Sequence, residues 1–215
     1  MSNWYILSSL TFESDKITIT ETGEEVMMSW EDSLMSASSA YVTEGGGDIL
    51  EIGFGMGIAS NYIQSHSINS HTIVENHPQI LEKLKTWANG KSNVTIISQS
   101  WADVTGSLST YDGVFYDTYG DEKNYLFSSS LSGLTKSGAK VTFWNNNQNE
   151  SNDLNIPNCT YKQISVTVDD NTVTNDTTGD DPLSTDTVAT NLKNSLDSAL
   201  TGFTIARNGP VLHIK

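Results

Sequence analysis

The sequence predicts an α/β protein built on a Rossmann-like, doubly wound and mostly parallel β-sheet. Short apolar runs alternate with helical segments between residues 49 and 144, and this alternation is typical of βαβ units. A glycine-rich turn follows the first apolar run, and polar or acidic residues follow several of the others. Because ligands bind at the carboxyl ends of the strands in such sheets, the same pattern predicts where a functional site lies.

The glycine-rich turn lies between a strand at 49–52 and a helix that begins at Ile58. Gly53, Gly55 and Gly57 alternate with larger residues, which lets the backbone turn sharply and approach a ligand closely. A dinucleotide-binding turn has the spacing G-x-G-x-x-G/A, whereas Ile58 stands here in place of the last glycine or alanine. The spacing therefore argues against NAD and favours a small nucleoside cofactor such as S-adenosyl-L-methionine.

An acidic residue supports this interpretation. Glu75 follows the apolar strand Thr72-Ile73-Val74, about 20 residues beyond the turn, where an acid bonds ribose hydroxyls in nucleotide-binding folds. The alternative is a strand–glycine–helix turn in an α/β protein that binds no nucleoside. Glu75 at this position favours the cofactor site.

The remaining elements continue the alternation. We expect helices at 58–64, 78–88 and about 122–134, and strands at 71–75, 94–97, 113–116 and 140–144. Several polar or conformationally special positions then fall at one edge of the sheet: Gly53, Glu75, the turn at 100–103, Asp117 and Asn145.

The N-terminal segment has a strand pattern at 16–20 and a helical pattern at 26–35. Met27, Glu31 and Met35 recur every four residues, so on a helix they share one face. A carboxylate buried without a partner is costly. The alternative for this helix places Glu31 at the boundary with solvent.

The end of the chain follows a different pattern. Residues 160–168 alternate like a strand, and 169–186 form an Asp-, Thr- and Asn-rich stretch that predicts an exposed loop. An amphipathic helix at 188–200 and strands at 203–206 and 211–214 follow.

Composition restricts the class of partner. The 215 residues carry a formal net charge of −15, which repels nucleic-acid phosphates and anionic membranes and suits a cationic substrate. The single cysteine, Cys159, excludes a disulfide framework, and the four histidines lack the spacing of metal ligands. No segment has the length and hydropathy of a membrane span. We expect a soluble, cytoplasmic protein without a metal.

Three motifs, in order, carry a resemblance to a known family. Val26-Met27-x-x-Trp30-Glu31-x-x-x-Met35 comes first, Leu50-Glu51-Ile52-Gly53-Phe54-Gly55-Met56-Gly57-Ile58-Ala59 second, and Tyr116-Asp117-Thr118-Tyr119 third. Over about residues 15–145 the chain resembles guanidinoacetate N-methyltransferase and the related fungal-type arginine N-methyltransferases. The resemblance implies the class I methyltransferase fold and S-adenosyl-L-methionine as cofactor.

The resemblance also implies a division of the chain. Residues 1–45 would cover substrate and cofactor, and residues 46–168 would form the Rossmann-like methyltransferase core. Residues 169–215, with the acidic loop and the last helix and hairpin, diverge from the family. The stretch 188–214 resembles segments of bacteriophage tail proteins.

The family pattern assigns the cofactor site. The cofactor's methionine part would be wrapped by the glycine turn, its ribose held by Glu75, and its adenine faced by the turn at 100–103, where Ala102 replaces the family's glutamate. The implied cofactor-binding residues are Met27, Met35, Phe54, Gly55, Met56, Gly57, Ile58, Ala59, Glu75, Asn76, His77, Trp101, Ala102 and Asp103.

The substrate side would be formed by two acids. A guanidinium ion presents paired N–H donors, which carboxylates accept bidentately, so Glu31 and Asp117 would clamp it. Protonated guanidinium has no nucleophilic lone pair, and Asp117 would accept the proton that leaves. Tyr119 would shape the pocket. Asn146 and Asn147 match substrate-contacting positions of the family, and a plain polar loop is an equally weighted interpretation of both.

These observations predict a methyltransferase for a small cationic guanidino compound, with guanidinoacetate first and arginine second. One alternative is an enzyme of the same fold that methylates a protein arginine or another amine. Another is a non-catalytic, phage-associated module that retains the fold. The sequence makes no prediction of oligomeric state, and we expect neither nucleic acid nor membrane as a partner.

Overall fold

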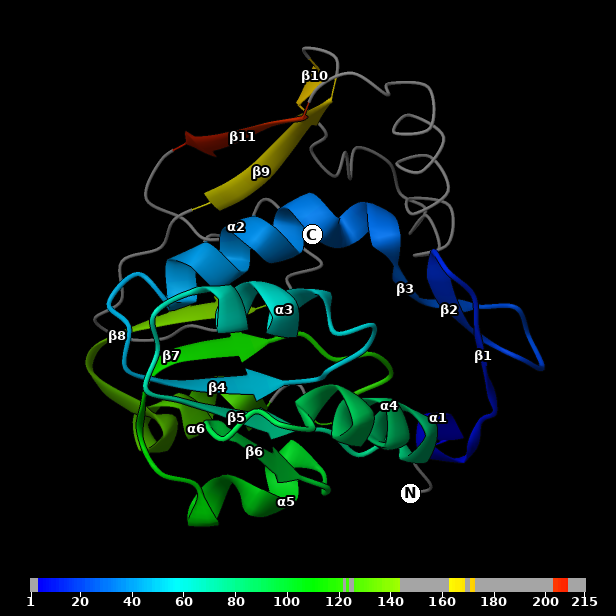
Figure 1. Ribbon diagram of the computed structural model, residues 1–215, viewed down its shortest axis with the longest axis horizontal. Helices are drawn as coiled ribbons and strands as arrows, with labels where there is room; N and C mark the ends of the chain where they lie inside the picture. The colour runs from blue at the N-terminus through cyan, green and yellow to red at the C-terminus, as the bar shows by residue number, and fades with distance from the viewer. Residues whose placement is uncertain are drawn as a thin grey trace.

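The computed structural model describes residues 4–121, 123, 126–143, 163–168, 171–172 and 203–208. Its centre is a five-stranded, all-parallel sheet in the order β6-β5-β4-β7-β8 (Figure 1). The chain enters the sheet in the middle, moves to one edge and then returns to build the other, which is the doubly wound topology that the sequence predicts. The strands are β4 Asp48–Ile52, β5 Ser70–Val74, β6 Val94–Ile97, β7 Tyr111–Tyr116 and β8 Thr135–Phe143.

Helices cover both faces of this sheet. In Figure 1, α2 and α3 lie on one side of the strands, and α5 and α6 lie on the other. The buried clusters agree, because residues of α2 and α3 pack with Ile49 and Phe115, whereas residues of α5 and α6 pack with Leu50 and Val114. The helices are α2 Asp32–Val42, α3 Ile58–Ser65, α4 Pro78–Ala88, α5 Trp101–Val104 and α6 Phe127–Leu134.

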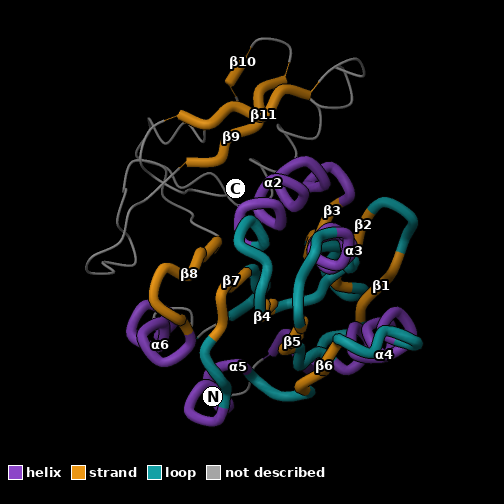
Figure 2. The backbone as a smooth tube through the Cα atoms, turned by 60° about the vertical axis from the view of Figure 1, so that its left-hand side comes forward, coloured by secondary structure: helices purple, strands orange, loops and turns teal. Residues whose placement is uncertain are grey.

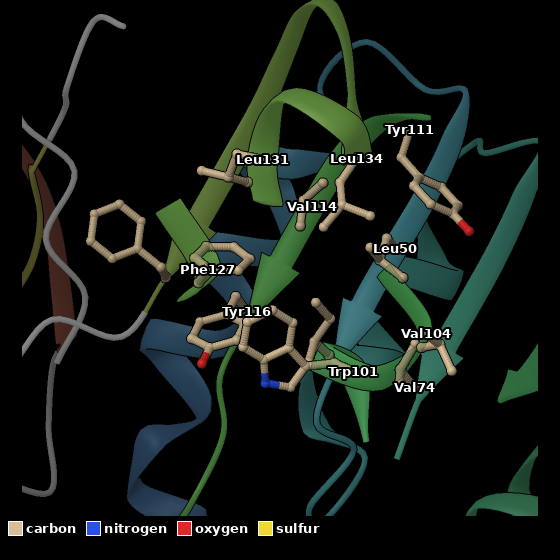
Figure 3. Packing of buried hydrophobic residues seen from close by; sticks show 12 residues of the cluster. Leu50, Val74, Trp101, Val104, Tyr111, Val114, Tyr116, Phe127, Leu131 and Leu134 are labelled. Atoms are coloured by element: carbon tan, nitrogen blue, oxygen red, sulfur yellow. The ribbon is translucent and has the colours of Figure 1, made fainter. Parts of the chain in front are cut away.

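The core on the side of α5 and α6 is aromatic (Figure 3). The ring of Tyr116 stacks on Phe127 with centroids 3.9 Å apart, and Trp101 meets both rings edge-on. Such contacts add to the burial of large apolar surfaces. The core therefore holds the carboxyl end of β7, where Asp117 follows, in a fixed position.

The N-terminal segment forms a small antiparallel sheet, and here one prediction was wrong. Met27 does not share a helical face with Glu31 and Met35, because it lies in a strand and pairs with Ile17. Glu31 lies in a 3₁₀ turn, accepting a hydrogen bond from the N–H of Met28, and the helix starts only at the next residue. The elements are α1 Trp4–Leu7, β1 Leu10–Phe12, β2 Lys16–Ile19, β3 Glu25–Met28 and η1 Ser29–Glu31.

Other boundaries differ by a few residues. The expected turn at 100–103 is the short helix α5, the helix expected at about 122–134 is α6 at Phe127–Leu134, and β8 begins at Thr135 instead of 140. Among the described residues, no helix is both long and apolar enough to cross a membrane.

A third sheet lies beyond α2, apart from the central strands (Figures 1 and 2). It is antiparallel in the order β10-β9-β11, with β9 Gln163–Val168, β10 Asn171–Thr172 and β11 Phe203–Asn208. The strands expected at 160–168 and 203–206 are found here, and β10 falls inside the expected loop at 169–186. The predicted helix at 188–200 and strand at 211–214 lie outside the described residues.

Candidate active site

The glycine turn at the carboxyl end of β4 forms the floor of the site. Gly53, Gly55 and Gly57 have φ angles of +92°, +53° and +76°, a region of backbone space that residues with a Cβ rarely adopt. A Cβ at Gly53 would overlap the backbone carbonyl oxygen of Asp117. The absence of a side chain at Gly53 therefore lets the end of β7 close directly on the end of β4.

The turn leads into α3 without a side-chain cap. Gly57 is the N-cap residue, and no side chain among the described residues caps the helix. These donors and the helix dipole favour an anionic group. The arrangement fits the carboxylate of S-adenosyl-L-methionine, the cofactor that the glycine spacing predicts.

Glu75 ties the end of β5 to the same turn. Its carboxylate accepts hydrogen bonds from the backbone N–H groups of Phe54 at 3.0 Å, Asn76 at 2.7 Å and His77 at 2.8 Å. A carboxylate has about four acceptor positions, so one remains for a ribose hydroxyl. Asn76 and His77 thus lie beside Glu75, as the family pattern implies.

The two methionines occupy different places. Met27 reaches over the turn, where its Sδ accepts the N–H of Met56 at 3.0 Å and lies against Gly55. Met35 is buried between α2 and the sheet with Ala59. Met27 thus reaches the glycine turn from strand β3, whereas Met35 lies on helix α2 in one buried cluster with Ala59 of α3.

Glu31 and Asp117 come from different elements, and the charge of Asp117 acts on the ionisation of Glu31. Glu31 is 8% exposed, and its burial, followed by the charge of Asp117, raises the pKa of Glu31 to about 8. The backbone N–H of Met28 donates to Glu31 Oε1 at 2.9 Å and opposes this rise. The charge of Glu25 adds to the rise.

Asp117 continues β7 by one residue, and its N–H donates to the carbonyl of Ile52 at 3.0 Å. Burial and then the charge of Glu51 raise the pKa of Asp117 to about 6. Neither Glu31 nor Asp117 takes part in an ion pair within the described part of the chain. Two acids with raised pKa values and no cationic partner among these residues form a site suited to a cation.

Two residues beside the candidate site escape sequence reasoning, and Asp121 is the first. Its Oδ2 accepts the hydroxyl of Tyr116 and the indole N–H of Trp101, both at 2.6 Å, and its Oδ1 accepts the N–H of Lys123 at 2.8 Å. These bonds hold the loop that carries Asp117. The only signal in the sequence is an acid four residues after Asp117.

Tyr5 is the second such residue. Its buried ring lies 4.9 Å from that of His77 and 5.0 Å from that of Tyr119. Burial, and then the charge of Glu75, raises the pKa of Tyr5. Tyr5 and Tyr119 thus form an aromatic wall beside Glu75, and the aromatic pair Trp4-Tyr5 is its signal in the sequence.

The residues expected to face adenine lie after β6. Trp101 is buried against Tyr116 and bonded to Asp121, and Ala102 packs on the same core cluster. Asp103 points to an exposed ion pair with Lys123, with 2.6 Å between Oδ1 and Nζ. Asn146 and Asn147 lie outside the described residues. Within the described ranges, no group of three or more His, Cys, Asp or Glu side chains is arranged to hold a metal.

The chain is similar in sequence to known methyltransferases. Protein arginine N-methyltransferase 2 of Aspergillus oryzae is 34% identical over 151 residues, which are 66% of this chain and 36% of that protein. Protein arginine N-methyltransferase 2 of Saccharomyces cerevisiae is 31% identical over 155 residues, 66% of this chain and 37% of that protein. The chain therefore spans roughly a third of the length of these relatives.

Solved structures support the fold. Precorrin-6y C5,15-methyltransferase from Geobacter metallireducens has a TM-score of 0.50 at 12% identity, over 71% of this chain and 78% of that one. Precorrin 8w decarboxylase from Methanobacterium thermoautotrophicum has a TM-score of 0.52 at 9% identity, over 68% and 83%. Residues 2–142 match the family model described as guanidinoacetate N-methyltransferase. This match covers more than half of the chain, which therefore belongs to the guanidinoacetate N-methyltransferase family of S-adenosyl-L-methionine-dependent N-methyltransferases.

Proposed function

We propose that this protein transfers a methyl group from S-adenosyl-L-methionine to a nitrogen of a small guanidino compound such as guanidinoacetate. The observation that carries the proposal is the pair of acids beside the glycine turn, the buried Glu31 and the partly buried Asp117, each with a raised pKa. A guanidinium ion is planar and donates paired hydrogen bonds to carboxylates. A site with two such acceptors selects it over a simple ammonium.

The cofactor would be held by the glycine turn, Met27 and Glu75, and it supplies an electrophilic methyl group on a sulfonium when bound. The clamp by Glu31 and Asp117 orients the attacking nitrogen, and such positioning lowers the barrier by several kcal/mol. The nitrogen gains its lone pair as its proton moves to the Asp117 carboxylate. Asp117 is suited to this step because its raised pKa makes it a stronger base than an ordinary aspartate.

Binding of a cationic substrate would change the protonation of Glu31 and Asp117. Without a cation, the two carboxyl groups cannot both ionise cheaply, and Glu31 stays protonated near neutral pH. A guanidinium ion placed between them stabilises both charges. Binding therefore releases a proton from Glu31, and Asp117 is left ionised and able to act as the base.

A second candidate is a protein arginine side chain, which presents the same guanidinium. The names of the curated relatives favour it. The small compound is our first choice because Glu31 is buried directly after β3, and the aromatic wall of Tyr5 and Tyr119 packs against β1 and β2 of the same N-terminal sheet.

The test is transfer of a labelled methyl group to guanidinoacetate, to free arginine and to an arginine-containing peptide. Asp117→Asn should abolish transfer and keep binding of S-adenosyl-L-homocysteine, and Asp15→Asn, at an exposed position between β1 and β2, is the matched control. Transfer to the peptide alone would favour the second candidate. A folded protein that binds no cofactor would contradict both candidates and favour the non-catalytic module.

A further inference from the structure

Three titratable residues form a row on one face of the central sheet. Ile49 pairs with His71, and Glu51 pairs with Ile73 on one side and with Phe115 on the other. Since side chains alternate between faces along a strand, His71, Glu51 and Asp117 point to the same face from the adjacent strands β5, β4 and β7. This is the face that α2 and α3 cover (Figure 1).

Glu51 is the middle residue of the row and is fully buried. The hydroxyl of Ser60, on α3, donates to Glu51 Oε2 at 2.5 Å, and His71 Nε2 lies 2.8 Å from the same oxygen. The other oxygen, Oε1, has no hydrogen-bond partner among the described residues. A buried carboxylate with an unpaired oxygen is costly to retain, and neither the cofactor site nor the substrate clamp uses Glu51.

His71 is oriented toward Glu51 by its other nitrogen. Nδ1 of His71 lies 3.3 Å from Nε2 of Gln64, and the ring is fully buried. With the amide of Gln64 as donor, Nδ1 is the acceptor, and this assignment places the ring proton on Nε2, next to Glu51. Glu51 is thus held by the hydrogen bond from Ser60 on α3, and the ring of His71 on β5 lies against it without a hydrogen bond between Nε2 and another described residue.

We propose that Glu51, bonded by Ser60 and packed against His71 on the same face of the sheet as Asp117, is a positioning residue that supports Asp117 as the proton acceptor. This inference rests on the proposed function only in taking Asp117 as the base. Glu51 is fully buried, and in this proposal it acts on Asp117 through the low-dielectric interior on one face of the paired strands β4 and β7.

The effect of Glu51 is distinct from that of the other charges near Asp117. The carboxyl groups that face this region from other elements are Glu31 from η1 and Glu25 from β3. Glu31 belongs to the substrate clamp and changes its charge when a cation binds. Glu51 is fully buried and bonded to Ser60, so we expect its influence on Asp117 to persist through the reaction.

The test measures the titration of Asp117 directly. The full chain, labelled with ¹³C at the aspartate carboxyl carbon, is titrated by NMR, and Asp117→Asn identifies the resonance. In Glu51→Gln the pKa of Asp117 should fall from about 6 to about 5 or below. His71→Gln, which keeps Glu51 and a neutral donor, is the control and should leave the Asp117 titration nearly unchanged.

Kinetics give the second measurement. The acid limb of the pH profile of kcat/KM should move down with the pKa of Asp117, and the rate at neutral pH should fall about three- to tenfold. If Glu51→Gln does not fold, Ser60→Ala weakens the hold on the Glu51 charge and should shift Asp117 in the same direction by less.

The outcomes separate this inference from the proposed function. An Asp117 titration that is the same in the wild-type protein and in Glu51→Gln overturns the inference, whatever the activity. A shifted titration in a protein that methylates no guanidino compound supports the coupling and contradicts the proposed function instead. A shifted titration with a matching shift of the pH profile supports both.

Discussion

The charge of Asp117 acts on the ionisation of Glu31 although the two carboxyl groups come from different parts of the fold. Asp117 follows the central strand β7 and is bound through its N–H to Ile52 on β4. Glu31 lies in the 3₁₀ turn after the N-terminal sheet, held by the N–H of Met28. The charge of Asp117 raises the pKa of Glu31, so the N-terminal segment and the Rossmann-like core share one electrostatic site.

This relationship predicts that Glu31 destabilises the free protein at alkaline pH. The folded-state pKa of about 8 exceeds that of an unfolded glutamate, so the native state binds more protons and stability falls as pH rises from about 4 to about 8. Glu31→Gln keeps the acceptor for Met28 and removes the charge. We expect a gain of about 2 kcal/mol in the free energy of unfolding by urea near pH 9.

The gain from Glu31→Gln should disappear near pH 5, where the wild-type residue is already protonated. Glu82→Gln, at an exposed position paired with Lys85, makes the same charge change and is the control. A gain of equal size at both pH values would contradict a buried, protonated Glu31.

Proton release on substrate binding is the second prediction. Since a bound guanidinium ion stabilises the ionised forms of Glu31 and Asp117, affinity should increase as pH rises from about 5 to about 8. Calorimetric titration with guanidinoacetate in buffers of different ionisation enthalpy measures the protons released. Glu31→Gln should bind more weakly and release fewer protons, and an unchanged proton count would contradict the clamp.

Close contact at the glycine turn gives the third prediction. Gly53 and Gly90 have similar φ angles of +92° and +83°, but only Gly53 has an atom in the path of an added Cβ, the carbonyl oxygen of Asp117. Gly90→Ala should cost about 1 kcal/mol of stability from backbone strain alone. Gly53→Ala should cost at least about 2 kcal/mol more and abolish cofactor binding, since β4 and β7 must separate. Equal costs in urea unfolding would contradict the contact.

The fourth prediction concerns Asp121, which accepts hydrogen bonds from Trp101, Tyr116 and Lys123. Asp121→Asn turns an acceptor into an amide donor that faces other donors, which should cost about 2–3 kcal/mol in urea unfolding. The loop that carries Asp117 should loosen, so kcat should fall more than KM rises. Asp32→Asn, which disturbs a single exposed bond with Tyr62, is the control and should have little effect on either quantity.

The predictions from sequence succeed where the signal is local. The strand, glycine turn and helix from β4 to α3, and the strands β5 to β7, are confirmed because each is specified by its own periodicity and turn residues. The helix expected at 26–35 was wrong because a spacing of four between Met27, Glu31 and Met35 does not exclude a strand followed by a turn. The pairing of Met27 with Ile17 selects the strand over the helix. A local sequence pattern cannot predict this pairing, because the two residues lie ten positions apart in the chain.

The sequence by itself determined the parallel α/β core, the sheet edge that carries the candidate site and the motifs of the family, since these follow from local periodicity, glycine spacing and residue types. Only the tertiary structure decided which charges meet. The 3₁₀ turn after the N-terminal sheet brings Glu31 within the electrostatic influence of Asp117. Asp121 accepts hydrogen bonds from α5 and β7, and strand order and register put Glu51 between His71 and Asp117. Burial raises the pKa values at this site, and burial is a property of the packed chain.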